Sequence, residues 1–217
     1  YSRAMILYHF ANSPFARRVR LALAHKGLSA ELRDPRASPE HVPEFHARSP
    51  MHTVPVLVDK ERTIADSTAI VHYLDRKWPH PPLFPQGEGG ALAFELAALA
   101  DSVIGVIVDL GGRYYTLHDH ARFPKVREQM VGRVQRSLSL IADKLSARGN
   151  GVPLCGAGWS WADIVVLTLV QWLEGLSIRA ATQPVPSQML SLGWTLPPVL
   201  SEWADQHRAR PDVIALG

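Results

Sequence analysis

The 217-residue sequence predicts an α/β domain followed by an all-α domain. Three observations support this fold class. Short strand-like patterns alternate with helical patterns as far as residue 77. The stretch KWPHPPLFPQGEGG, residues 77–90, is rich in proline and glycine and interrupts regular structure. Only helical periodicity follows it. We therefore expect an α/β domain at residues 1–78, a linker at 79–90 and an all-α domain at 91–217.

The first domain is predicted to combine a β-α-β unit with a β-β-α unit. Its strands are expected at residues 4–8, 30–33, 55–58 and 62–64, and its helices at 14–25, 39–47 and 67–77. The second domain is expected to hold helices at residues 91–113, 125–148, 161–178 and 198–209. The clearest helix start is in GWSWADIVV, where Ser160 is an N-cap and Asp163 completes a capping box. We interpret both residues as structural.

Composition and charge argue against several classes of function. The net charge is only +3 and acidic residues are interspersed among basic ones, so no nucleic-acid face is expected. There is no uninterrupted apolar run of about 18 residues and no signal-peptide pattern near the start, which favours a cytoplasmic protein outside the membrane. Cys155 is the single cysteine and the histidines lack ligand spacing, so neither a disulfide nor a metal site is expected.

Ser13, in the stretch NSPFARRVR, has two compatible interpretations. Serine followed by proline is typical of a helix start, with Ser13 as N-cap and Pro14 as the first helical residue. The same helix start gathers free N–H groups and partial positive charge, which favour an anion such as a thiolate. A serine hydroxyl can donate one hydrogen bond while it accepts another. Asn12 is an adjacent amide donor, so the contact to such an anion can come from either residue.

Two further stretches could hold a small peptide. In TVPVLVD, Val54 precedes Pro55 at the entry to a strand. The sequence alone favours a trans bond there, whereas a cis bond would expose the backbone of Val54 to an extended peptide. In IADSTAIVHYL, Asp66 is either a helix N-cap or the partner of a ligand ammonium, with Ser67 taking a carboxylate. Their coincidence with Ser13 in one small domain favours a binding site.

These stretches resemble the cytosolic glutathione transferase family. SPFARRVRLALAHKG, SPMHTVPVLVD and IADSTAIVHYL are similar, in order, to the first-helix motif, the Val-Pro turn and the acid-Ser motif of its thioredoxin-like N-terminal domain. GWSWADIVV and LPPVLSEWADQHRARPDV are similar to motifs of its helical domain. The resemblance spans nearly the whole chain.

The resemblance implies a glutathione site. Ser13 would lie at the sulfur, the backbone before a cis Pro55 would pair with the cysteinyl unit, and Asp66 with Ser67 would bind the γ-glutamyl end. The implied glutathione-binding residues are Ser13, Phe15, Thr53, Val54, Pro55, Asp66 and Ser67. The implied second-substrate pocket is formed by Phe10, Ala11, Arg113, Tyr114 and Tyr115. The family is usually homodimeric, and the second subunit completes the cleft.

The Ser-Pro-Phe pattern defines the chemistry that the resemblance implies. A serine hydroxyl cannot form a mixed disulfide, so thiol-disulfide exchange is disfavoured. The pattern resembles the serine-type transferases, such as the plant tau branch and bacterial relatives. We expect Ser13, or Asn12, to stabilise the glutathione thiolate for attack on a small hydrophobic electrophile, by conjugation or peroxide reduction, as in detoxification. The alternatives are a non-catalytic glutathione-binding or protein-binding module, and a specialised isomerase, dehalogenase or lyase. The Ser-Ser-Cys triplet of the isomerising zeta branch is absent.

Overall fold

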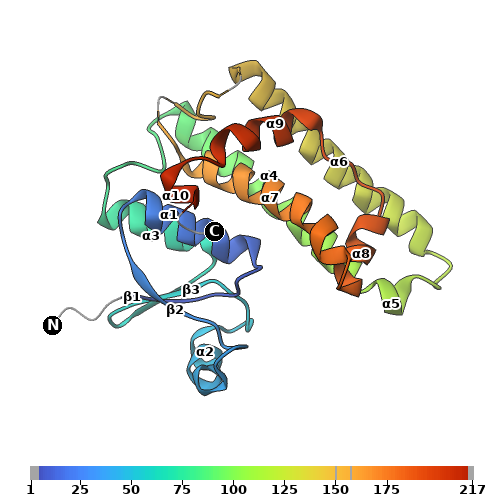
Figure 1. Cartoon of the computed structure of the whole chain (residues 1–217), viewed down its shortest axis with the longest axis horizontal. Coiled ribbons are helices and arrows are strands. Elements are labelled where there is room, and N and C mark those ends of the chain that lie inside the picture. The colour runs from blue at the N-terminus through green and yellow to red at the C-terminus, as the bar shows by residue number, and fades with distance from the viewer. Residues whose placement is uncertain (1–4, 150, 157, 215–217) are drawn as a thin grey trace.

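The computed structural model of the chain describes residues 5–149, 151–156 and 158–214 (Figure 1). A four-stranded sheet lies in its N-terminal part, with strand order β2-β1-β3-β4. Strand β1 pairs in parallel with β2, and β3 pairs antiparallel with both β1 and β4. The strands are β1 (Met5–Tyr8), β2 (Ala30–Arg33), β3 (Val56–Asp59) and β4 (Arg62–Ala65).

Three helices cover this sheet. They are α1 (Pro14–His25), α2 (Val42–Arg48), which a 3-10 turn at Pro39–His41 precedes, and α3 (Ser67–Lys77). Figure 1 shows α1 and α3 on the side of the sheet that faces the helical part of the chain, and α2 on the other side. The alternation of strand side chains explains this layering, because Leu57 enters the large core whereas Val56 and Val58 pack with Phe45 of α2.

The rest of the described chain is helical, which confirms the predicted fold class. The four predicted helices are present, and α4 begins three residues before its expected start. Three short helices, α5, α8 and α10, were not predicted. The elements are α4 (Glu88–Gly112), α5 (Tyr114–Leu117), α6 (Phe123–Arg148), α7 (Trp161–Ala180), α8 (Pro184–Ser191), α9 (Pro198–His207) and α10 (Pro211–Ile214).

Helix α7 is the central helix of this part and packs against α1, α4, α8 and α9. Its predicted capping box is confirmed. The Asp163 carboxylate accepts hydrogen bonds from the Ser160 N–H at 2.8 Å, the Ser160 hydroxyl at 2.6 Å and the Leu154 N–H at 2.8 Å. All three groups are buried. The capping box therefore fixes the start of the helix that carries one wall of the candidate site.

Two helices, α4 and α7, are long and apolar enough to cross a membrane by length and composition, although the sequence lacks an uninterrupted apolar run of that length. The most apolar stretch of α7 is 72% buried inside the protein, whereas that of α4 is 39% buried. Helix α7 is thus a core helix, and α4 has an apolar face that is partly uncovered.

Candidate active site

Ser13 is the N-cap of α1, as predicted. Its backbone is extended, with φ −76° and ψ 120°, and its Oγ accepts a hydrogen bond from the Ala16 N–H at 3.2 Å. Pro14 occupies the first helical position, and the first turn contains no acidic residue. Since the hydroxyl proton is not used by the cap, Ser13 can still donate to a second acceptor. The first turn of α1 therefore offers a donor and a partial positive charge at one place.

Ser13 lies where two cavities meet. One is mainly apolar and has a volume of about 380 Å³, and the other is polar and has a volume of about 250 Å³. Both are lined by Asn12, Ser13, Pro14, Trp172 and Arg179. The apolar cavity is also lined by Phe10, Phe15, Val108, Leu176, Gln183, Val185, Pro186 and Met189. The polar cavity is also lined by Ala11, Arg17, Gln171 and Arg208. A reactive group held at Ser13 would face both cavities.

The Val-Pro turn lies beside this helix start. The Val54–Pro55 peptide bond is cis, as the resemblance implies. Val54 packs in one cluster with Phe10 and Ala16, which flank Ser13 in the chain. Ser49 Oγ accepts a hydrogen bond from the Thr53 N–H at 3.0 Å and donates one to the Thr53 carbonyl at 2.9 Å. Within the described residues the N–H and C=O of Val54 have no hydrogen-bond partner, so both are available to a ligand.

Asp66 and Ser67 begin α3. Asp66 has φ 78°, a sparsely populated region for a residue other than glycine, and its side chain accepts from the Ala69 N–H at 3.0 Å. The N-cap interpretation is therefore confirmed. Ser67 is buried, and its Oγ has no hydrogen-bond partner among the described residues. An unpaired hydroxyl beside an exposed carboxylate can take one ligand that carries both an acceptor and an ammonium group.

Buried Arg18 connects this helix start to α4. Its guanidinium pairs with Asp101 and lies over the ring of Phe15 at 4.9 Å. Burial lowers the pKa of Arg18, while the charges of Asp101 and Asp66 oppose that shift. Asp66 therefore acts electrostatically on Arg18 in α1. Arg18 thus joins Phe15 of α1 to Asp101 of α4.

The predicted second-substrate residues are only partly brought together. Phe10 lines the apolar cavity and Ala11 lines the polar one. Arg113 and Tyr114 line neither cavity, because they follow the end of α4 and are held there by local partners. Arg113 donates to Asp109 at 2.7 Å, and Tyr114 stacks on His118. The side chain of Tyr115 lies outside the described part of the structure. From α4, Val108 lines the cavity instead.

Sequence reasoning missed the wall that α7 and α8 supply. Trp172 is buried, as expected of a core residue, yet it lines both cavities. Arg179 and Met189 also line the site, and α8 was not predicted as a helix. One signal in the sequence could have indicated this wall. Trp172, Leu176 and Arg179 are spaced by four and three residues, so they lie on one face of the predicted helix.

Cys155, the single cysteine, does not belong to this site. It is buried, and burial raises the pKa of its thiol to about 11. A thiol of that pKa is protonated near neutral pH and is a weak nucleophile. Cys155 lines a different cavity from the two at Ser13.

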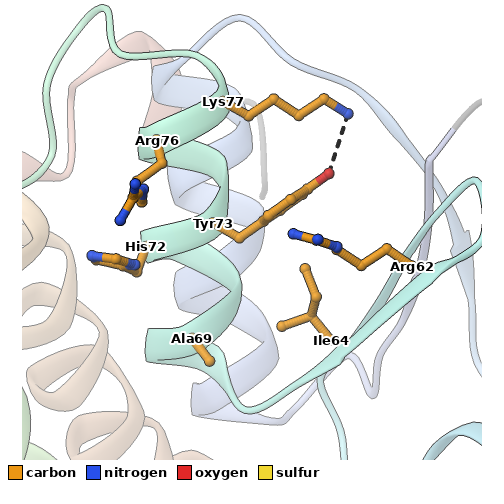
Figure 2. Close-up of a pocket in the computed structure, with 7 residues that line it drawn as sticks. All are labelled: Arg62, Ile64, Ala69, His72, Tyr73, Arg76 and Lys77. Atoms are coloured by element: carbon orange, nitrogen blue, oxygen red, sulfur yellow. Dashed lines mark hydrogen bonds between the residues drawn. The ribbon is translucent and has the colours of Figure 1, made fainter.

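A separate pocket lies on α3 and β4. Figure 2 shows Arg62 and Ile64 of β4 facing Tyr73 of α3, with His72 and Arg76 further round the helix. Tyr73 and Lys77 both hydrogen-bond to Asp59, and these contacts lower the pKa of Asp59 although its burial opposes the shift. The cavity has a volume of about 560 Å³ and is rimmed by basic side chains. It shares no lining residue with the two cavities at Ser13.

The fold and the site define a class of protein that has a thioredoxin-like N-terminal domain with a helix-start site, followed by a helical domain that lines it. Comparisons with known proteins show which family the N-terminal part matches. Residues 7–82 match the family "Glutathione S-transferase, N-terminal domain". A probable maleylacetoacetate isomerase of Vibrio cholerae is 42% identical over 101 residues, 45% of this chain and 46% of that protein.

Two further similar proteins are also glutathione S-transferases. Glutathione S-transferase 1 of Dianthus caryophyllus is 40% identical over 112 residues, 50% of this chain and 51% of that protein. A glutathione S-transferase of Methylobacillus flagellatus, solved with bound glutathione, is 25% identical with a TM-score of 0.75 and covers 99% of both chains. The matches span about half the length of these curated relatives. The N-terminal part of the chain thus matches the glutathione S-transferase family, and the whole chain has the fold of a solved glutathione S-transferase.

Proposed function

We propose that the protein is a glutathione transferase that activates the glutathione thiol as a thiolate for attack on a small hydrophobic electrophile. The reaction is conjugation, with peroxide reduction as a related use of the same thiolate. One observation carries the proposal: the Ser13 hydroxyl stands at the N-terminus of α1, at the junction of two cavities. In the cell we propose a cytoplasmic role in detoxification.

Glutathione fits the polar groups around α1. Its cysteinyl backbone would pair with the N–H and C=O of Val54 in the manner of an added strand. Its α-amino-acid end would place the ammonium at Asp66 and the carboxylate at Ser67 and the first N–H groups of α3. The glutathione-bound relative of the same fold supports this assignment.

The energy required of Ser13 is within the range of one hydrogen bond. A free thiol has a pKa of about 8.5, so a decrease of about two units requires roughly 2.7 kcal/mol of preference for the thiolate. A hydrogen bond to a charged acceptor contributes about 1.5–3 kcal/mol. The N-terminus of α1 adds about 0.3–1 kcal/mol. Ser13 is thus a hydrogen-bond donor to the sulfur, and no separate base is required.

Turnover of a neutral aryl chloride tests this role. The thiolate sulfur bonds to the ring carbon that carries chlorine, and chloride leaves. We expect Ser13→Ala to lower kcat by about ten-fold or more while glutathione still binds. Asn12→Ala tests the other candidate donor, whose Oδ1 accepts from Arg36 at 3.4 Å. A full loss in Asn12→Ala with no loss in Ser13→Ala would transfer the donor role to Asn12.

We also propose that the chain forms a homodimer. The apolar face of α4 is partly uncovered and includes exposed Phe94. Phe94 stacks on Phe84 and lies beside His72, which lines the pocket in Figure 2. A second copy would cover this face. Light scattering should give twice the chain mass, and Phe94→Asp should shift it toward the single chain. A single-chain mass for the wild type would contradict the proposal.

A specialised glutathione-dependent isomerase is the second candidate, and the name of the Vibrio cholerae relative favours it. The missing Ser-Ser-Cys triplet weighs against it. A binding module without catalysis is the third candidate. Retention on immobilised glutathione without conjugation of any electrophile would favour the binding module, and failure to bind glutathione would favour a purely protein-binding role.

A further inference from the structure

The polar cavity beside Ser13 is unusually rich in arginine. Arg17 of α1, Arg179 of α7 and Arg208, which follows α9, all line it. Its other described lining residues are neutral, and none is acidic. Arginines of three different elements thus meet within one cavity, next to the proposed position of the thiolate.

The three arginines differ in how their charge is compensated. Arg208 pairs with Glu174 and Asp205. Arg17 donates only to the amide oxygen of Gln171, at 3.0 Å. Arg179 donates to the backbone carbonyl of Trp172 at 3.2 Å. Within the described residues, Arg17 and Arg179 therefore lack a carboxylate partner.

Both of these cations are partly removed from water. Burial lowers the pKa of Arg17, and the nearby charge of Arg208 lowers it further. Burial also lowers the pKa of Arg179. A partly desolvated guanidinium without a counter-ion is stabilised when an anion binds, and its planar donor geometry suits a carboxylate.

Gly175 lies beneath the Arg179 side chain on α7. The Arg179 side chain folds back along α7 across Gly175 toward the Trp172 carbonyl. A Cβ at position 175 would lie 3.1 Å from Arg179 Nη1, closer than ordinary van der Waals contact. An alanine at this position would require the guanidinium to move by a few tenths of an ångström.

The two cavities share a boundary. Ser13, Trp172 and Arg179 line both the apolar and the polar cavity. A ligand body in the apolar cavity can therefore extend an anionic group to Arg179 and Arg17 while its reacting carbon faces Ser13.

We propose that the second substrate is an electrophile with an apolar body and a carboxylate, and that Arg179 and Arg17 bind the carboxylate in the polar cavity. This inference rests on the proposed function and specifies its substrate class. It predicts a preference for an anionic electrophile over a neutral one of the same shape, and a KM for the anionic one that rises with salt.

Two matched aryl chlorides test the proposal, chlorodinitrobenzene and its carboxylated analogue chlorodinitrobenzoate. In both, the thiolate sulfur replaces chlorine and chloride leaves, so only the carboxylate differs. The measured quantity is the ratio of kcat/KM for the carboxylated compound to kcat/KM for the neutral compound. We expect Arg179→Met to reduce this ratio by about ten-fold or more. Gly175→Ala should change the ratio less than Arg179→Met does, because it only displaces the guanidinium slightly, and it keeps the helix because alanine favours helix more than glycine. Arg127→Met, on the exposed face of α6, is the matched control and should leave the ratio unchanged.

Binding measurements separate this inference from the proposed function. If the wild type conjugates neither probe, the proposed function fails, and calorimetric titration with unreactive dinitrobenzoate and dinitrobenzene still decides the inference. Tighter binding of dinitrobenzoate that Arg179→Met abolishes would support it. An unchanged ratio in Arg179→Met, or equal binding of both compounds, would overturn it. A rise in the glutathione KM with an unchanged ratio would instead assign Arg179 to a glutathione carboxylate, which also overturns it.

Discussion

Ser13 and Ser160 each precede a helix of the same protein, yet their surroundings differ. Ser160 is fully buried, and its N–H and hydroxyl both donate to Asp163. Ser13 is half-buried, its helix has no acidic residue in the first turn, and two cavities open beside it. Both residues cap a helix. The comparison shows that a capping serine is structural where a neighbouring carboxylate accepts a hydrogen bond from its hydroxyl. Where no such carboxylate is present, the hydroxyl can donate to a ligand.

The largest effect is expected at Asp163. Asp163→Ala would leave the buried N–H groups of Leu154 and Ser160 without an acceptor. We expect a loss of about 2–4 kcal/mol in the free energy of unfolding, measured by urea denaturation. Asp163→Asn keeps one acceptor and should lose less. If Asp163→Ala lowered the free energy of unfolding by less than about 0.5 kcal/mol, the interpretation of the Ser160 helix start as structural, in contrast to that at Ser13, would be wrong.

Substitution of the two capping serines should affect stability and catalysis differently. Ser160→Ala should cost about 1–2 kcal/mol of unfolding free energy, with kcat per folded molecule unchanged. Ser13→Ala should cost about 1 kcal/mol or less, because water can reach its helix start. Urea denaturation and kcat measured on the same preparations check both expectations. A drop in kcat in folded Ser160→Ala would show that both caps affect the chemistry.

A smaller effect is expected at the carboxylate of Asp59. Lys77 and Tyr73 hold the pKa of Asp59 below its ordinary value even though burial opposes the shift. A lowered folded-state pKa contributes stability above the unfolded pKa of about 3.9, and this contribution is lost as the pH falls through the folded pKa. The wild type should therefore lose its advantage over Asp59→Asn below about pH 4. A stability difference that does not change with pH would contradict this account.

Much of the fold was predictable because its signals are local. The helix starts at Ser13, Asp66 and Ser160 follow from capping chemistry, and α1 and α3 have the bounds that the periodicity predicts. The short helices α5, α8 and α10 were missed because four to eight residues give too little periodicity.

The proposed glutathione-binding side of the site was more predictable than the second pocket. Ser13, Val54 and Asp66 lie in local motifs; Ser13 caps α1, Val54 packs against that helix start, and Asp66 caps α3. The second pocket depends on how α7 and α8 pack against α1, which no local pattern encodes. Arg113 and Tyr114 were predicted there on family resemblance, whereas Trp172 and Arg179 line the cavities.

The pKa of the glutathione thiol in the complex tests the central claim most directly. Ultraviolet absorbance of the thiolate, followed as a function of pH, should give a value about two units below the free thiol in the wild type. Ser13→Ala should raise it by about one unit or more, and Ser160→Ala should leave it unchanged. A thiol pKa that is the same in the wild type and in Ser13→Ala would contradict the account.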